Sequence, residues 1–153
     1  KIILVGHSYG TAVAAKMATL PYIKYQSVFL FSAIADPEEV KNDKPTKITK
    51  FFDPFSASFI GQSLIPNNIL VCQKEISSFD KNLTSLLSDW NKIAAKVVVV
   101  NGENDDRAKV SNGPFIKSKI GGNTTEVKVI KGAGHSLIND NTFDVVNLLL
   151  KEL

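Results

Sequence analysis

The chain has 153 residues, of which 44% are apolar and 22% charged, as in an ordinary folded domain with a hydrophobic core. Its 18 basic and 15 acidic residues leave a net charge of +3, too small and too scattered to predict a nucleic-acid partner. No apolar run approaches the roughly 18 residues of a membrane-spanning helix, so we expect no membrane span. The single cysteine, Cys72, excludes an internal disulfide framework. It leaves the cellular compartment open, with a slight preference for the cytoplasm.

The first predicted elements are a buried strand and a helix. Residues Ile2–Val5 form an apolar run that indicates the strand, and the alanine-rich run Thr11–Leu20 indicates a helix that Pro21 ends. Within this helix an apolar stripe recurs at helical spacing, with Ala14 and Ala18 beside it: Val13, Met17 and Leu20. The spacing therefore predicts an amphipathic helix.

Between this strand and helix lies a glycine–x–serine–x–glycine pattern, Gly6-His7-Ser8-Tyr9-Gly10. The pattern is typical of a sharp turn that holds a serine hydroxyl out from the backbone in a strained conformation. Such a turn leaves no room for side chains two residues before and two residues after the serine, so Gly6 and Gly10 are expected to support it. We therefore interpret Ser8 as a nucleophile rather than a helix N-cap.

Strands and helices alternate along the rest of the chain. In order, they are a strand at Ser27–Phe31, a helical stripe through Leu83–Trp90, a strand at Lys96–Val100, a helix starting at Pro114, a strand at Glu126–Ile130 and a helix at Asn141–Leu153. The last helix is expected to place its larger apolar residues on one side: Phe143, Val146, Leu149, Leu150 and Leu153. Because each crossover helix returns the chain in the same direction, the alternation predicts a parallel sheet.

A serine hydroxyl is an effective nucleophile only when a base accepts its proton and a carboxylate orients that base. In open parallel sheets such groups lie in loops after the carboxyl ends of strands. Two loops fit, Gly102–Asp106 and Lys131–Ser136, and the second holds His135. The other histidine, His7, adjoins Ser8 on a tight turn, where neighbours point apart, so we expect it to brace the turn. Several carboxylates compete for the role of acid: Asp105, Asp106, Glu103 and Asp36.

Three segments together resemble the α/β-hydrolase superfamily: strand–GHSYG–helix, Gly102-x-x-Asp105 after a valine-rich strand, and Gly-x-Gly-His135 near the end. The order serine, acid, histidine is also the order of that superfamily. The resemblance implies Ser8 as nucleophile, Asp105 as acid and His135 as base. It also implies the backbone N–H of Tyr9 as one donor to the oxyanion. The resemblance covers nearly the whole chain.

The resemblance implies an α/β fold that corresponds to the C-terminal part of an α/β-hydrolase, with about four parallel strands flanked by helices. Residues 1–35 and 91–153 are expected to form this core. Residues 36–90 match the variable cap of the superfamily only in position, and we expect a mostly helical cap or lid there. Two interpretations stay open for its phenylalanines, an apolar lid over Ser8 or ordinary packing within the insertion: Phe51, Phe52, Phe55 and Phe59.

The strands that precede the nucleophile strand in the superfamily have no counterpart in this sequence. The loop that normally supplies the second oxyanion donor has none either. The strand Ile2–Val5 is then expected at an edge of the sheet with apolar residues exposed. We therefore expect a fragment or one part of a paired assembly, in which a further N-terminal segment or a partner chain covers this strand.

The activity that the resemblance implies is that of a serine hydrolase acting on carboxylic ester-like substrates, such as a carboxylesterase or lipase. The sequence shows no cluster of metal ligands, so no metal or organic cofactor is expected. Two alternatives stay open. One is a non-catalytic small-molecule receptor or binding module on the same fold, and the other is a cofactor-free acyltransferase or perhydrolase.

Overall fold

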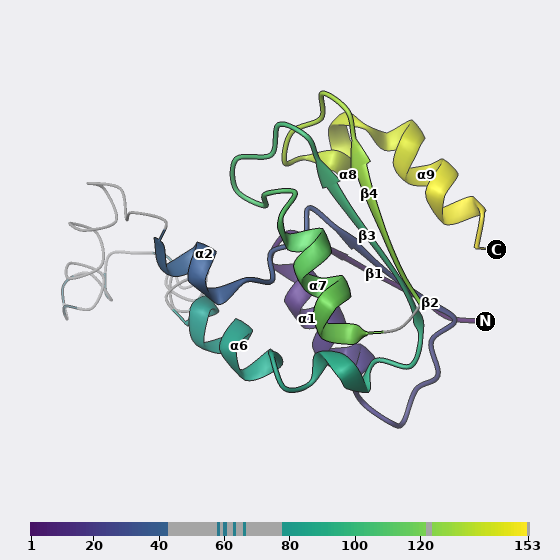
Figure 1. Cartoon of the computed structure of the whole chain (residues 1–153). Coiled ribbons are helices and arrows are strands. Elements are labelled where there is room, and N and C mark those ends of the chain that lie inside the picture. Colours follow the sequence, from purple (N-terminus) through teal and green to yellow (C-terminus); the bar gives the residue numbers. More distant parts are fainter. Residues whose placement is uncertain are drawn as a thin grey trace. The chain divides into compact units, whose positions relative to one another are not determined.

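The computed structural model describes residues 1–42, 78–121 and 124–152, together with Ser58, Ile60, Ser63 and Pro66. Backbone contacts divide the chain into two compact units, Lys1–Asp36 with Ser85–Leu153, and Pro37–Thr84. The first unit contains the sheet and the predicted nucleophile, acid and base (Figure 1). The cap assigned to residues 36–90 stays a prediction. Several residues singled out in the sequence lie outside the described residues: Phe51, Phe52, Phe55, Phe59 and Cys72.

In the described residues four strands form one parallel sheet in the order β1-β2-β3-β4. They are β1 (Ile3–His7), β2 (Ser27–Phe31), β3 (Lys96–Gly102) and β4 (Thr125–Ile130). The register pairs His7 with Phe31 and Phe31 with Val100, so the carboxyl ends of these strands meet at one end of the sheet. The predicted parallel sheet is confirmed, and β1, as predicted, is an edge strand.

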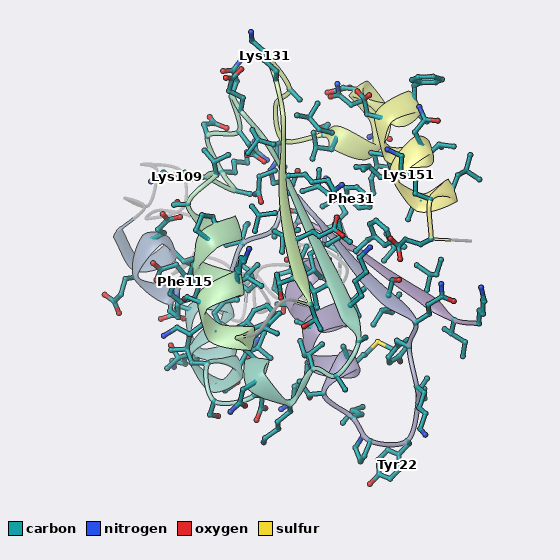
Figure 2. All side chains as sticks on the ribbon, turned by 45° about the vertical axis from the view of Figure 1, so that its right-hand side comes forward. Tyr22, Phe31, Lys109, Phe115, Lys131 and Lys151 are labelled. Carbon is teal, nitrogen blue, oxygen red and sulfur yellow. The ribbon has the colours of Figure 1, made fainter. Side chains whose placement is uncertain are left out.

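Helices cover both faces of the sheet (Figure 1): on one face α1 (Gly10–Ala18) and α7 (Asn112–Ile120), on the other α8 (Leu137–Asp140) and α9 (Thr142–Leu150). Successive side chains along a strand therefore point alternately into two hydrophobic cores, one on each face of the sheet. Val97 packs in the core with α1 and α7, and Val98 packs in the core with α8 and α9. Burial on both faces explains why Val97–Val100 is a continuous valine run rather than an alternating one. Phe31 lies inside the molecule, whereas Tyr22 projects into solvent from the loop before β2 (Figure 2).

Most residues of the apolar stripes predicted for α1 and α9 are exposed, which corrects the expectation from spacing; Leu149 of α9 is half-buried against the core, and Leu153 lies outside the described residues. The side chains that α1 buries are small: Thr11, Ala14, Ala15 and Ala18. The stripe residues predicted for this segment are exposed: Val13, Met17 and Leu20. On α9, Val145 is buried, and three predicted stripe residues are exposed: Phe143, Val146 and Leu150. The spacing identified the helices but not their buried faces, because a helix close to a strand selects small side chains for the contact.

The remaining described helices are α2 (Pro37–Asn42), α6 (Phe79–Leu86) and the short 3₁₀ helix η1 (Trp90–Lys92). Pro114, predicted as a helix start, is the third residue of α7, where a missing backbone N–H carries no cost. The short helix α8 was not predicted from the sequence. Asn141, with φ −123° and ψ 39°, separates it from α9. None of the described helices has the length and apolar character that crossing a membrane requires.

Candidate active site

Ser8 lies on the turn between β1 and α1. Its φ of 53° falls in the left-handed region, which a residue with a side chain rarely adopts. The Ser8 amide donates to the Phe31 carbonyl (3.0 Å), and the Thr11 hydroxyl and amide both donate to the Ser8 carbonyl (2.6 and 2.9 Å). The strained backbone is therefore held by the neighbouring strand on one side and by the first turn of the helix on the other.

The two glycines that flank this turn differ in their surroundings. A Cβ at Gly6 would lie 2.5 Å from the Gly10 carbonyl oxygen and 2.9 Å from the Ala14 Cβ, so β1 and α1 pack closely there. A Cβ at Gly10 would meet no atom of the described residues within 4 Å. Among the described residues, the lack of space predicted for both positions is therefore found only at Gly6, and packing against them does not explain the glycine at position 10.

The loop between β4 and α8 brings His135 to Ser8 across 127 positions of sequence, with Nε2 of His135 2.8 Å from the Ser8 Oγ. The other ring nitrogen, Nδ1, lies 3.0 Å from each carboxylate oxygen of Asp105. Because a carboxylate only accepts hydrogen bonds, Nδ1 carries a hydrogen. The Nε2 of a neutral ring is then able to accept the proton of the Ser8 hydroxyl.

Asp105 is fixed in the loop after β3 with its side chain fully buried (0% exposed). Its Oδ1 also accepts the backbone N–H groups of Arg107 (3.0 Å) and Ala108 (2.8 Å). Three residues earlier, a Cβ at Gly102 would overlap the backbone of the histidine loop at Ala133 and Gly134. The two loops are therefore packed backbone against backbone, which brings the carboxylate within reach of the imidazole.

Among the carboxylates that competed for the role of acid, Asp105 is the one bonded to His135. Glu103 accepts the Gly132 amide (2.8 Å) and thus connects the same two loops at another point. The Asp36 amide donates to the side chain of Asn112 (3.1 Å). Asp106 is exposed to solvent.

His7 was expected to brace the turn around Ser8, and the structure gives its ring a different partner. Its Nε2 donates to the backbone carbonyl of His135 (3.0 Å), and the two imidazole centroids lie 5.5 Å apart. Ser32, which was not predicted from the sequence, donates its hydroxyl to the same carbonyl (2.6 Å). Ser32 is fully buried and has a φ of 47°. No motif marks a serine that simply follows an apolar strand, so only the tertiary contact reveals it.

Tyr9, whose backbone N–H was predicted as an oxyanion donor, is the N-cap residue of α1. Its amide therefore lies at the positive end of the helix dipole, where negative charge is stabilised. Within the part of the chain that the structure describes, no group of three or more His, Cys, Asp or Glu side chains could hold a metal ion.

Neither a protein-family model nor a curated protein matches the chain. Solved structures do match it. A monoacylglycerol lipase from Paleococcus ferrophilus is 16% identical with a TM-score of 0.64, and the match covers 100% of this chain and 69% of that one. MenH from S. aureus is 18% identical with a TM-score of 0.61, with 100% and 68% covered.

A meta-cleavage product hydrolase from Pseudomonas fluorescens is 14% identical with a TM-score of 0.58, and the match covers 99% of this chain and 64% of that one. The chain thus spans about two thirds of the length of these structures. All three have the α/β-hydrolase fold. The four-stranded parallel sheet of this chain, with helices on both faces, is therefore part of an α/β-hydrolase fold.

Proposed function

We propose that the protein is a serine hydrolase that cleaves carboxylic ester-like substrates through an acyl-enzyme. The main observation behind the proposal is a chain of hydrogen bonds: the Ser8 Oγ lies 2.8 Å from Nε2 of His135, and Nδ1 of His135 lies 3.0 Å from the Asp105 carboxylate. The strained turn at Ser8 supports it, because backbone strain concentrates at functional sites. The names of the solved structures with this fold, among them a lipase and a meta-cleavage product hydrolase, agree with a hydrolase.

In the proposed reaction the Ser8 Oγ attacks the carbonyl carbon of the ester while Nε2 of His135 accepts the hydroxyl proton. Asp105 stabilises the imidazolium that forms and keeps its Nδ1–H in place. His135 then donates the proton to the departing alcohol, which leaves an acyl group on Ser8. A water molecule, deprotonated by the same imidazole, attacks this acyl group and releases the carboxylic acid and the free serine.

The negative charge on the attacked carbonyl oxygen requires preorganised hydrogen-bond donors, commonly two or more. We assign one of them to the backbone N–H of Tyr9, at the N-terminus of α1. The sequence offers no motif for the second donor. We expect it from a polypeptide segment or partner chain beside β1, which is an edge strand of the described sheet and leads directly to Ser8.

A fluorophosphonate probe tests the proposed function, since it reacts only with an activated serine. We expect the protein as its gene encodes it to be labelled at Ser8, with the site mapped by mass spectrometry. Ser8→Ala should abolish labelling, and His135→Gln should slow it by about 100-fold or more because the hydroxyl loses its base. Ser118→Ala is the matched control, because its hydroxyl bonds the Phe115 carbonyl on the exposed surface of α7.

Labelling, followed by product analysis with and without an added alcohol, distinguishes the candidate functions. A protein that takes up no probe is a binding module, and the hydrolase proposal is then wrong. A labelled protein that passes an acyl group to an added alcohol in preference to water is an acyltransferase. Release of the free acid at the same rate with and without the alcohol is the result that the proposal requires.

A further inference from the structure

Two non-glycine residues of the described chain have a positive φ, Ser8 (53°) and Ser32 (47°), and both contact His135. Ser8 bonds the imidazole, whereas Ser32 bonds the backbone carbonyl. Left-handed backbone at a residue with a side chain persists only where the surrounding contacts impose it, and such residues cluster at functional sites. The strain at Ser32 therefore indicates a role in the same site as Ser8.

The carbonyl oxygen of His135 is a point where three donors converge. The Ser32 hydroxyl lies 2.6 Å from it, Nε2 of His7 lies 3.0 Å from it, and the Leu137 amide lies 3.0 Å from it. The first two donors are 103 and 128 positions away in sequence. His7 ends β1 and Ser32 directly follows β2, so this carbonyl is attached to the ends of two strands.

The two donors that are remote in sequence, His7 and Ser32, can hold the His135 carbonyl at all times. A carbonyl oxygen only accepts, so Nε2 of His7 carries a hydrogen, and it does so in the neutral ring and in the charged ring alike. The Ser32 amide donates to the Val100 carbonyl (2.8 Å), which holds the backbone of Ser32 against β3. The hydroxyl that reaches His135 is thus fixed from the sheet side, independently of the histidine loop.

The loop that carries His135 is fixed before the histidine, where Glu103 accepts the Gly132 amide (2.8 Å) and the Asn104 amide donates to the Ala133 carbonyl (2.8 Å). At the histidine itself, the Leu137 amide closes an inverse γ-turn at Ser136 (φ −84°, ψ 48°), and the bonds from Ser32 and His7 attach the same carbonyl to the sheet. Proton transfer needs Nε2 within about 2.6–3.2 Å of the hydroxyl, and a displacement of about 1 Å lowers rates by about 100-fold. A carbonyl held from two strands limits such displacement.

We propose that Ser32 and His7 are positioning residues that hold the backbone carbonyl of His135, and through it the imidazole, between Ser8 and Asp105. Neither residue touches a reacting atom, and each acts through the histidine. The kinetic consequence rests on the proposed hydrolase function, whereas the position of the ring does not. The test therefore has one readout that depends on activity and one that does not.

Three variants separate positioning from structural support. Ser32→Gly removes the hydroxyl and its hydrogen bond, and the relief of the positive φ offsets part of that loss, so the fold should persist. His7→Leu removes the second donor, and His7→Gln keeps an N–H donor at a similar reach. Ser27→Ala is the matched control, because Ser27 is an equally buried serine of β2 whose hydroxyl bonds Glu152 (2.8 Å) instead of the histidine loop.

The readout that is independent of activity is proton NMR of the protein as its gene encodes it, labelled with ¹⁵N-histidine; residues 1–153 contribute two imidazoles. We expect a hydrogen-bonded Nδ1–H signal from His135, assigned by its loss in His135→Gln. The signal should broaden or disappear in Ser32→Gly and in His7→Leu, and it should persist in His7→Gln and Ser27→Ala. Thermal unfolding of each variant checks that the fold is intact.

The readout that depends on activity is hydrolysis of a p-nitrophenyl ester by the protein as its gene encodes it. We expect kcat to fall by about 10- to 100-fold in Ser32→Gly and His7→Leu with KM changed less than threefold, and His7→Gln to recover most of the loss. If the wild type shows the NMR signal and its loss in the variants but has no esterase activity, the proposed function fails and the positioning role stands. Folded variants that keep both the signal and the rate overturn the positioning role.

Discussion

At the residue scale, the site depends on the buried carboxylate of Asp105, in which both oxygens accept hydrogen bonds. Asp105 accepts the Nδ1–H of His135 and the N–H groups of Arg107 and Ala108. The two backbone bonds fix the carboxylate, so it imposes one tautomer and one orientation on the imidazole. In the proposed mechanism Asp105 therefore acts by fixing the tautomer of His135 as well as through its charge.

Asp105→Asn should lower kcat on an ester substrate by about 10⁴-fold, because an amide nitrogen at this position favours the wrong tautomer of His135. The fold should persist, since the remaining amide oxygen still accepts the Arg107 and Ala108 amides. Steady-state kinetics measure the change, and Asp106→Asn, at the exposed neighbouring position, is the control that should leave kcat unchanged. An Asp105→Asn enzyme with wild-type kcat would remove Asp105 from the mechanism.

The close approach of β1 and α1 predicts a difference between two glycines of the same motif. Gly6→Ala should reduce the free energy of unfolding by about 1–3 kcal/mol, because its Cβ meets the Gly10 backbone and the Ala14 side chain. Gly10→Ala should change it by less than about 1 kcal/mol, since a Cβ there has open space in the described residues. Urea denaturation of both variants measures this. Equal losses would contradict the packing that the structure shows.

At the scale of elements, a three-residue ion cluster connects α1 to η1. The buried Asp89 carboxylate bonds the ammonium groups of Lys16 in α1 and Lys92 in η1. The two lysines lower the pKa of Asp89 from 3.8 to about 2, since each favours the charged carboxylate. A second cluster, in which the pKa of Glu126 and Glu152 is lowered chiefly by Lys96, ties the start of β3 to the end of the chain.

Acid should selectively remove the contribution of Asp89 to stability. Its folded pKa lies below the unfolded value of 3.8, so the contribution is present above pH 4 and is lost as the pH falls toward 2. Compared with Asp89→Asn, the wild type should be more stable at pH 6, and the difference should shrink between pH 4 and pH 2. Denaturant midpoints at each pH measure it. A difference that stays constant over this range would show that the ion pairs do not stabilise the fold.

At the scale of the whole molecule, apolar side chains are exposed on β1, an edge strand of the described sheet, and on α1, which packs against it. Val5 of β1 is 43% exposed, and Val13 of α1 is 48% exposed. An uncovered strand edge with apolar surface beside it tends to pair with other chains. That a further segment or a partner chain covers β1 stays a prediction.

The chain of 153 residues studied alone should therefore self-associate through β1. Sedimentation at increasing concentration should show oligomers, and a Val5→Lys substitution should shift the chain toward monomer because a charge on an edge strand opposes pairing. Val110→Lys, at an exposed apolar position in the loop before α7, is the control that should leave the association unchanged. A wild-type chain that stays monomeric at about 100 µM contradicts the prediction.

The sequence by itself determined the order of the four described strands, the parallel sheet, and Ser8 and His135 as the candidates for nucleophile and base. Valine runs, the GHSYG turn and the glycines before Asp105 and His135 are local signals, because they reflect what a backbone needs at one place. The tertiary structure decided which faces of α1 and α9 are buried, which carboxylate meets the imidazole, and that Ser32 and His7 bond the carbonyl of His135. The bonds to His135 join residues 30, 103 and 128 positions apart, and no local pattern encodes the distance between two such segments.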